Sequence, residues 1–177
     1  MLPDFKANHF ALFGLPARFE LDGAALDVAF RQLQAQVHPD RFAHLSEADK
    51  RASLQWSTRV NEAYQVLKSP LMRAAYLLQQ QGVDALAPEN TQLPAVFLMQ
   101  QIEWREAIAG ARKDADDVAL QRVEVEMQTM ARRLQANLAN ALDVQQDLVS
   151  AAQRVRELKF IDKIRAELDE AFVALDR

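Results

Sequence analysis

Apolar side chains recur along this chain at steps of three and four residues, which is the spacing of one helix face. The pattern predicts a short helix over residues 8–13, and a second helix that begins behind Asp22 and stops before Pro39. Leu26 and Leu33 fall on the inward face of that second helix. No convincing alternating strand pattern is present, so the sequence favours an all-α fold.

Two further helices are predicted in the first half of the chain. Ser46 opens the third helix, since Ser46 and Asp49 are typical of a capping box with Asp in place of the usual Glu, and Ser69 ends it. Pro70 is expected in the first turn of the fourth helix. Gly82 is expected to close that helix from the position after its C-cap.

The segment 82–93 lacks a clear amphipathic period and contains Pro88, so we interpret it as a linker between two modules. The first module is 1–81 and the second is 94–177. The second module is predicted to be an antiparallel three-helix bundle. Its helices are expected over about residues 94–111, 114–142 and 144–175.

Composition excludes several classes of protein. The 177 residues are 50% hydrophobic and contain no Cys, so a real core is expected, without disulfides or Cys-ligated metal. A net charge of -4 disfavours a nucleic-acid partner. No stretch reaches the roughly 18 apolar residues of a membrane span, and the N-terminus carries no targeting pattern. We expect a chain that starts near Met1, in a bacterial-type cytoplasm, without a membrane partner.

Catalytic chemistry is not indicated. His9, His38 and His44 lie in separate segments without the spacing of metal ligands. Neither a Gly-rich phosphate loop nor a nucleophile elbow occurs. We therefore predict no catalytic residues, no metal site and no cofactor, and a protein that is not an enzyme.

The tripeptide His38-Pro39-Asp40 stands between the second and third predicted helices. Pro39 makes the loop stiff because its ring fixes φ, and Asp40 can present a carboxylate to a cationic group of a partner. The alternative interpretation is a simple helix stop with an Asp in the loop. The surrounding sequence favours the binding interpretation, because it resembles the J-domain of DnaJ-type co-chaperones. The residues that carry this resemblance are His38, Pro39, Asp40, Arg41, Asn61-Glu62-Ala63-Tyr64, Val66-Leu67, Pro70, Arg73-Ala74 and Tyr76.

The J-domain resemblance implies a helical hairpin that contacts the ATPase module of a DnaK-type chaperone and promotes ATP hydrolysis. The residues expected at this contact are His38, Pro39, Asp40, Arg31 and Arg41. The helix before the loop departs from the usual pattern, since Arg31 is its only cation and electrostatic steering should be weak. Arg41, Lys50 and Arg51 would compensate if they lie on the same side.

The helix predicted from residue 94 has two apolar stripes, whereas docking into a bundle needs only one. Phe97, Trp104 and Ile108 form the expected core face. The opposite stripe either packs against the first module or binds a partner with an apolar, partly basic surface. Its members are Leu98, Met99 and Ile102, with Glu103 and Glu106 among them.

Four sequence segments are FALFGLPARFELD, SPLMRAAYLL, VFLMQQIEWRE and VRELKFIDKI. They extend the resemblance to the HscB family of J-proteins, which serve iron-sulfur cluster assembly. This resemblance implies an L-shaped monomer with the chaperone HscA and the scaffold protein IscU as partners. The scaffold-binding residues that it implies are Leu98, Met99, Ile102, Glu103, Glu106 and Phe160. Gly110 stands where a further acidic residue would have continued the patch.

The sequence thus predicts an all-α co-chaperone with a J-domain and a scaffold-binding bundle. The alternative is a helical adaptor that links proteins without stimulating an ATPase. A helix-turn-helix regulator is a weaker third interpretation, because the acidic balance provides little grip on phosphate groups.

Overall fold

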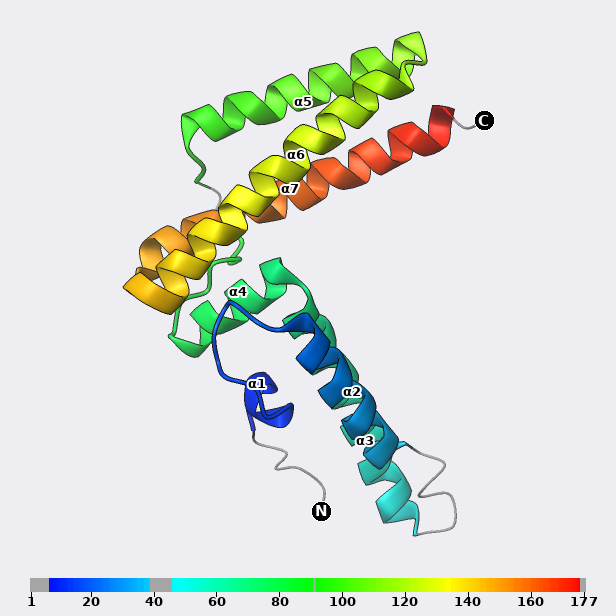
Figure 1. Ribbon diagram of the computed structural model, residues 1–177, viewed down its shortest axis with the longest axis vertical. Helices are drawn as coiled ribbons and strands as arrows, with labels where there is room; N and C mark the ends of the chain where they lie inside the picture. The colour runs from blue at the N-terminus through cyan, green and yellow to red at the C-terminus, as the bar shows by residue number, and fades with distance from the viewer. Residues whose placement is uncertain (1–6, 39–45, 91, 176–177) are drawn as a thin grey trace. The chain divides into compact units, whose positions relative to one another are not determined.

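The computed structural model describes residues 7–38, 46–90 and 92–175, and every regular element within these residues is a helix (Figure 1). The prediction of an all-α chain is confirmed for this part of the sequence.

The chain divides into two compact units, Met1–Leu77 and Leu78–Arg177. The division falls within helix α4, which spans Pro70–Gln80. The segment 82–93 therefore belongs to the second unit, and the side chain of its Ala85 is buried.

Side-chain caps begin the two long helices of the N-terminal unit at the predicted residues. The carboxylate of Asp22 accepts hydrogen bonds from the backbone N–H groups of Ala24 and Ala25, at 2.9 and 3.2 Å. The hydroxyl of Ser46 accepts from the N–H of Asp49 at 3.2 Å and donates to the Asp49 carboxylate at 2.6 Å. Each cap satisfies N–H groups that have no partner within the helix. The helices of this unit that precede α4 are α1 (His9–Leu12), α2 (Gly23–Val37) and α3 (Glu47–Lys68).

Helices α2 and α3 form an antiparallel hairpin (Figure 1). The predicted inward positions Leu26 and Leu33 are buried, while Phe30 is half-buried and stacks on Tyr64 with the ring centroids 4.0 Å apart. The buried residues that α2 and α3 contribute to this core are Leu26, Leu33, Val37, Trp56, Val60, Ala63 and Leu67.

Gly82 ends α4 as predicted. Its φ of 80° lies in the left-handed region that glycine adopts without strain. The N–H of Gly82 donates to the carbonyl of Gln79 at 3.0 Å, and the N–H of Val83 donates to the carbonyl of Leu78 at 2.9 Å. This pair of bonds is a Schellman motif, which gives partners to carbonyls left free at the end of the helix.

The C-terminal unit contains three long helices that run antiparallel in chain order, as predicted (Figure 1). The predicted core face of the first of them is confirmed, since Phe97, Trp104 and Ile108 are buried. The elements of the bundle are α5 (Ala95–Asp114), α6 (Asp117–Ala139), the π-helix η2 (Asn140–Gln145) and α7 (Leu148–Leu175).

The turns of the bundle differ from the sequence prediction. Helix α5 continues to Asp114 and ends because Ala115 adopts a left-handed φ of 52°. Asp116 then caps α6 by accepting from the N–H of Ala119 at 2.9 Å. The break expected near residue 143 lies later, because η2 prolongs α6 until Gln146 turns the chain with a φ of 55°.

Two polar contacts join the helices of the bundle. The indole N–H of Trp104 on α5 donates to a carboxylate oxygen of Glu126 on α6 at 3.1 Å. Arg105 on α5 forms a two-pronged pair with Glu167 on α7, with Nε and Nη2 each 3.0 Å from a carboxylate oxygen. This guanidinium lowers the pKa of Glu167. The pair fixes α5 against α7 at residues far apart in the sequence.

Candidate functional site

The predicted chaperone-binding loop begins where α2 ends. His38 is exposed and extended, with φ of -60° and ψ of 129°. The preceding residue, Val37, is buried, and its carbonyl accepts a 2.7 Å hydrogen bond from the buried hydroxyl of Ser53 on α3. Pro39, Asp40 and Arg41 lie outside the described residues.

Ser53 is a supporting residue of this region that the sequence analysis did not identify. A helix-terminal carbonyl lacks a partner within its own helix, and a buried carbonyl without a partner is unfavourable. The Ser53 hydroxyl supplies that partner and ties the last residue of α2 to α3. A small hydroxyl residue between the apolar positions of α3 was the available sequence signal, but its partner is 16 residues away.

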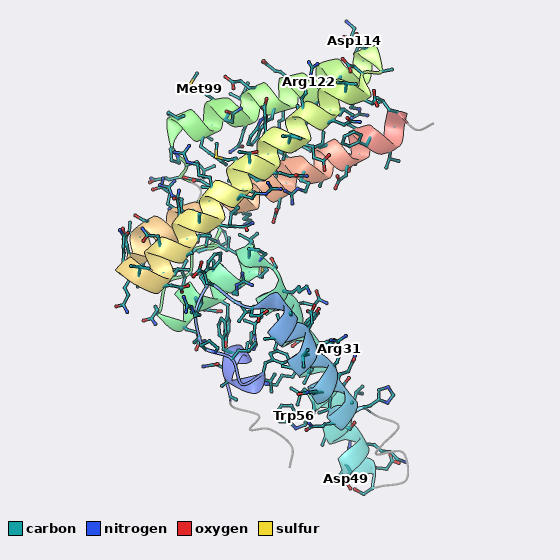
Figure 2. The ribbon with its side chains drawn as sticks, in the orientation of Figure 1. Arg31, Asp49, Trp56, Met99, Asp114 and Arg122 are labelled. Carbon is teal, nitrogen blue, oxygen red and sulfur yellow. The ribbon has the colours of Figure 1, made fainter. Side chains whose placement is uncertain are left out.

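The outer face of α2 carries little positive charge. Arg31 is exposed and extends from the helix (Figure 2). Asp27, one turn earlier, accepts hydrogen bonds from Lys68 at 2.6 Å and from the Tyr64 hydroxyl at 2.9 Å. These two donors lower the pKa of Asp27, and the charge of Arg31 contributes in the same direction. Arg31 thus stands near a carboxylate, which agrees with the expected weak electrostatic steering.

The two cations at the start of α3 are engaged locally. The Lys50 ammonium lies 2.8 Å from the Glu47 carboxylate, and Arg51 Nε donates to the Glu47 carbonyl at 3.2 Å. Both contacts are exposed, and an exposed pair of this type is worth at most about 1 kcal/mol. A partner can therefore displace them, but the structure gives no support to a preformed basic surface made of Lys50 and Arg51.

The second apolar stripe of α5 is exposed. The exposed fractions are 45% for Leu98, 62% for Met99 and 56% for Ile102, and Figure 2 shows Met99 on the outside of the helix. Glu103 and Glu106 are also exposed on this helix. These residues are therefore outside the core of the C-terminal unit. We call Leu98, Met99 and Ile102 with the two glutamates the α5 patch.

Val96 was missed by the sequence analysis, although it is a further exposed apolar residue of α5. Its side chain is 81% exposed and precedes Met99 by one helical turn. The sequence signal was an apolar residue directly beside Phe97, because neighbouring positions of a helix point about 100° apart and Phe97 is buried. Gly110 has open space where a side chain would project. A Cβ atom at this position would meet no neighbour.

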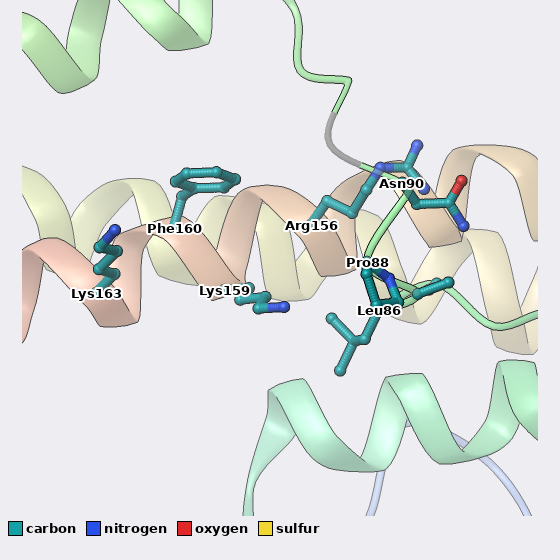
Figure 3. Close-up of a pocket in the computed structure, with 9 residues that line it drawn as sticks. Leu86, Pro88, Asn90, Arg156, Lys159, Phe160 and Lys163 are labelled. Atoms are coloured by element: carbon teal, nitrogen blue, oxygen red, sulfur yellow. The ribbon is translucent and has the colours of Figure 1, made fainter.

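Phe160, the scaffold-binding residue expected on the last helix, lines a pocket. It is half-buried and lines a pocket of about 220 Å³, together with Arg156, Lys159 and Lys163 of α7 and residues of the turn 85–90 (Figure 3). The lining of this pocket contains no residue of α5. The structure therefore places Phe160 beside three cations of its own helix and a turn.

Other chemistry is not apparent in the described residues. No group of three His, Cys, Asp or Glu side chains there is placed to hold a metal ion. His9 stacks on Tyr76 with the ring centroids 4.2 Å apart, and burial lowers its pKa, which is typical of a packing role. Within residues 7–38, 46–90 and 92–175, no helix combines the length and apolar character needed to cross a membrane.

Comparison with known proteins gives consistent matches along the chain. Residues 93–169 match the family model described as the HSCB C-terminal oligomerisation domain. The chain is 47% identical over 176 residues to the co-chaperone protein HscB homolog of Azoarcus sp., and the match covers 99% of each chain. It is 52% identical over 172 residues to the corresponding protein of Chromobacterium violaceum, with 97% of each chain covered.

Solved structures agree with these matches. The chaperone HscB from Vibrio cholerae is 40% identical, with a TM-score of 0.85, and the match covers 96% of this chain and 99% of that chain. The human co-chaperone protein HscB is 28% identical, also with a TM-score of 0.85, and the match covers 96% of this chain and 84% of the human one.

Proposed function

The chain belongs to the HscB family of J-type co-chaperones, and from this membership we propose that it stimulates the ATPase of the DnaK-type chaperone HscA and delivers the iron-sulfur scaffold protein IscU to it. Family membership implies a chaperone partner and a role in iron-sulfur cluster assembly. The identities of the chaperone and of its cargo are the parts that we propose.

The observation that carries the delivery role is the α5 patch. One face of α5 holds the core through Phe97, Trp104 and Ile108, while the opposite face leaves Leu98, Met99 and Ile102 largely exposed. Apolar side chains on an exposed helix face, beside acidic residues, suit a partner with an apolar and partly basic surface. We propose that IscU binds there through Leu98, Met99, Ile102, Glu103 and Glu106, with Phe160 as a further contact.

The stimulation role is supported by the way in which the loop starts. Ser53 holds the end of α2 against α3, directly before His38. An anchored helix end loses less conformational freedom when a partner binds next to it. Asp40 then offers its carboxylate to a cationic group of the chaperone, with His38, Pro39, Arg31 and Arg41 at the same contact.

Stimulation and delivery are coupled because a single chain carries both sites. When the J-domain is bound to the chaperone, scaffold held by the C-terminal unit encounters the chaperone intramolecularly. This raises the effective concentration of the scaffold without any new contact. We propose that the chain itself catalyses no reaction and contributes only binding energy.

The experiment is single-turnover ATP hydrolysis by purified HscA, with this protein and IscU added separately and together. We expect stimulation by the protein alone and a larger stimulation when IscU is added. Asp40→Asn should weaken the stimulation about tenfold or more, because it removes one partner of a charged hydrogen bond, while IscU binding is retained. Asp169→Asn, which removes an exposed carboxylate of α7, is the matched control.

Equal stimulation by Asp40→Asn and the unmodified protein would contradict the proposed role of the loop. No stimulation at all, with IscU still bound, would identify the chain as a helical adaptor. We further propose that it acts in the cytoplasm as a monomer and binds neither membranes nor nucleic acid. The matched family model is described as an oligomerisation domain. Light scattering, which gives the mass of the protein in solution, therefore tests directly whether it is a monomer.

A further inference from the structure

The pocket at Phe160 combines an apolar interior with a cationic rim. Its apolar wall comes from Leu86 and Pro88 in the turn 85–90 and from the Phe160 ring (Figure 3). Arg156, Lys159 and Lys163 of α7 also line it. These cations recur at steps of three and four residues, so one face of α7 presents them together.

The turn that forms the wall of the pocket is held by its own hydrogen bonds. The Asp84 carboxylate accepts from the N–H of Leu86 at 3.1 Å, and the Asp84 carbonyl accepts from the Asn90 side chain at 2.9 Å. The N–H of Asn90 donates to the carbonyl of Ala87, also at 2.9 Å. The wall is thus preorganised, which lowers the entropic cost of filling the pocket.

The rim of the pocket is positively charged. In the described part of the chain, neither Arg156 nor Lys159 forms an ion pair, and the Arg156 Nε makes only a long 3.4 Å hydrogen bond to the Gln92 carbonyl. Lys163 is exposed and acts electrostatically on Glu167, whose carboxylate is already held by Arg105. A carboxylate brought to this rim meets Arg156 and Lys159, which form no ion pair within the described residues.

The volume of the pocket limits the size of the group that can bind in it. Sites for drug-sized molecules and cofactors occupy about 300–1,000 Å³, whereas this pocket is about 220 Å³. One leucine-sized or phenylalanine-sized side chain is a better match for such a space. An apolar side chain fills the interior, and acidic neighbours of that side chain reach Lys159 and Lys163.

We propose that this pocket is a docking site for an acidic segment of a partner protein, which inserts one apolar side chain between the turn 85–90 and α7 and places its flanking carboxylates against Arg156, Lys159 and Lys163. The inference goes beyond the proposed function, because it assigns a second site with the opposite charge preference to the α5 patch. It does not require the partner to be IscU. Phe160 is shared with the proposed scaffold contact, so the test uses a probe other than the scaffold.

The probe is a short acetylated peptide in which a central leucine is flanked by two acidic residues on each side. It is titrated into the full-length protein labelled with ¹⁵N, and amide shifts are followed by NMR. We expect saturable shifts at Phe160, Lys159 and Lys163. Replacing the central leucine by serine should abolish saturation, because the interior of the pocket is apolar.

Matched protein variants distinguish binding at this pocket from nonspecific attraction of the peptide to positive charge. Lys159→Ala with Lys163→Ala should weaken peptide binding about fivefold, the scale of two exposed charge pairs. Arg132→Ala with Arg133→Ala removes the same charge from exposed positions of α6 and should leave binding unchanged.

Three outcomes would overturn the proposal. The first is an absence of shifts at Phe160 and the two lysines. The second is equal binding by the lysine variant and the unmodified protein. The third is the same set of shifts with sodium acetate at equal carboxylate concentration, which would indicate a small-anion site instead of a docking site. None of these outcomes bears on HscA stimulation or on the α5 patch.

Discussion

Removal of the apolar side chains at Leu98 and Ile102 gives the sharpest test of the α5 patch. The variant is Leu98→Ala with Ile102→Ala, because alanine has the highest helix propensity and leaves α5 intact. Both positions lie opposite the core face of α5, so the free energy of unfolding should change little. A loss of binding by this variant then reports a lost contact and not a lost fold.

The expected magnitude follows from the exposed fractions. Leu98 is 45% exposed and Ile102 is 56% exposed, so a partner can bury roughly half of each side chain. Complete burial of such a side chain is worth about 1.5–3 kcal/mol, and the remaining half is therefore worth about 1 kcal/mol. The two substitutions together should weaken IscU binding by about 2 kcal/mol, or about 30-fold in Kd.

The assay is isothermal titration of IscU into the variant and into the unmodified protein. Val125→Ala is the matched control, because Val125 on α6 is 61% exposed and lies outside the α5 patch. Stimulation of HscA in the absence of scaffold should be the same in all three proteins. Unchanged IscU affinity in the double variant, with helicity preserved, would refute the assignment of the α5 patch.

Three further predictions concern stability. Ser53→Ala should lower the free energy of unfolding, measured in urea, by about 1–2 kcal/mol, because the buried Val37 carbonyl loses its partner. A free energy of unfolding equal to that of the unmodified protein would contradict the role of Ser53 in holding the end of α2. Gln101→Leu should raise that free energy by about 1 kcal/mol, because the Gln101 side-chain N–H₂ group is buried in the described structure without a partner. Arg105 lowers the pKa of Glu167, so the stability from this pair is complete above the ordinary value of 4.5 and is lost as the pH falls through the lowered value. Glu167→Gln should remove this part of the acid dependence of the free energy of unfolding. If the variant keeps the pH dependence of the unmodified protein, the Arg105–Glu167 pair does not contribute to stability in this way.

The ends of several helices were predictable because the forces that set them are local. Asp22 and Ser46 bond to N–H groups two or three residues ahead, and Gly82 ends α4 through its own backbone conformation. The turns of the bundle were not predictable in the same way. Ala115 and Gln146 both adopt left-handed backbone, a conformation that neither residue type signals.

The candidate sites show the same difference between features set locally and features set by packing. The α5 patch was visible in the sequence because a 3.6-residue period determines which side chains share a helix face, and Leu98, Met99 and Ile102 are exposed as that period requires. The period also marked Phe97 as core and turned Val96, about 100° further round the helix, towards solvent, although Val96 was overlooked. Gln101 lies on the buried side despite its amide, since its place on the helix determines its burial.

The sequence by itself determined which segments are helical, where capped helices begin and which face of each helix is apolar, because these properties depend on side chains within a few positions of one another. Only the tertiary structure decided that Ser53 supports the end of α2, that Arg105 pairs with Glu167 and that Phe160 shares a pocket with a turn. These contacts join residues that are 16 positions apart or more. Their formation depends on how whole helices pack, which no local spacing along the chain records.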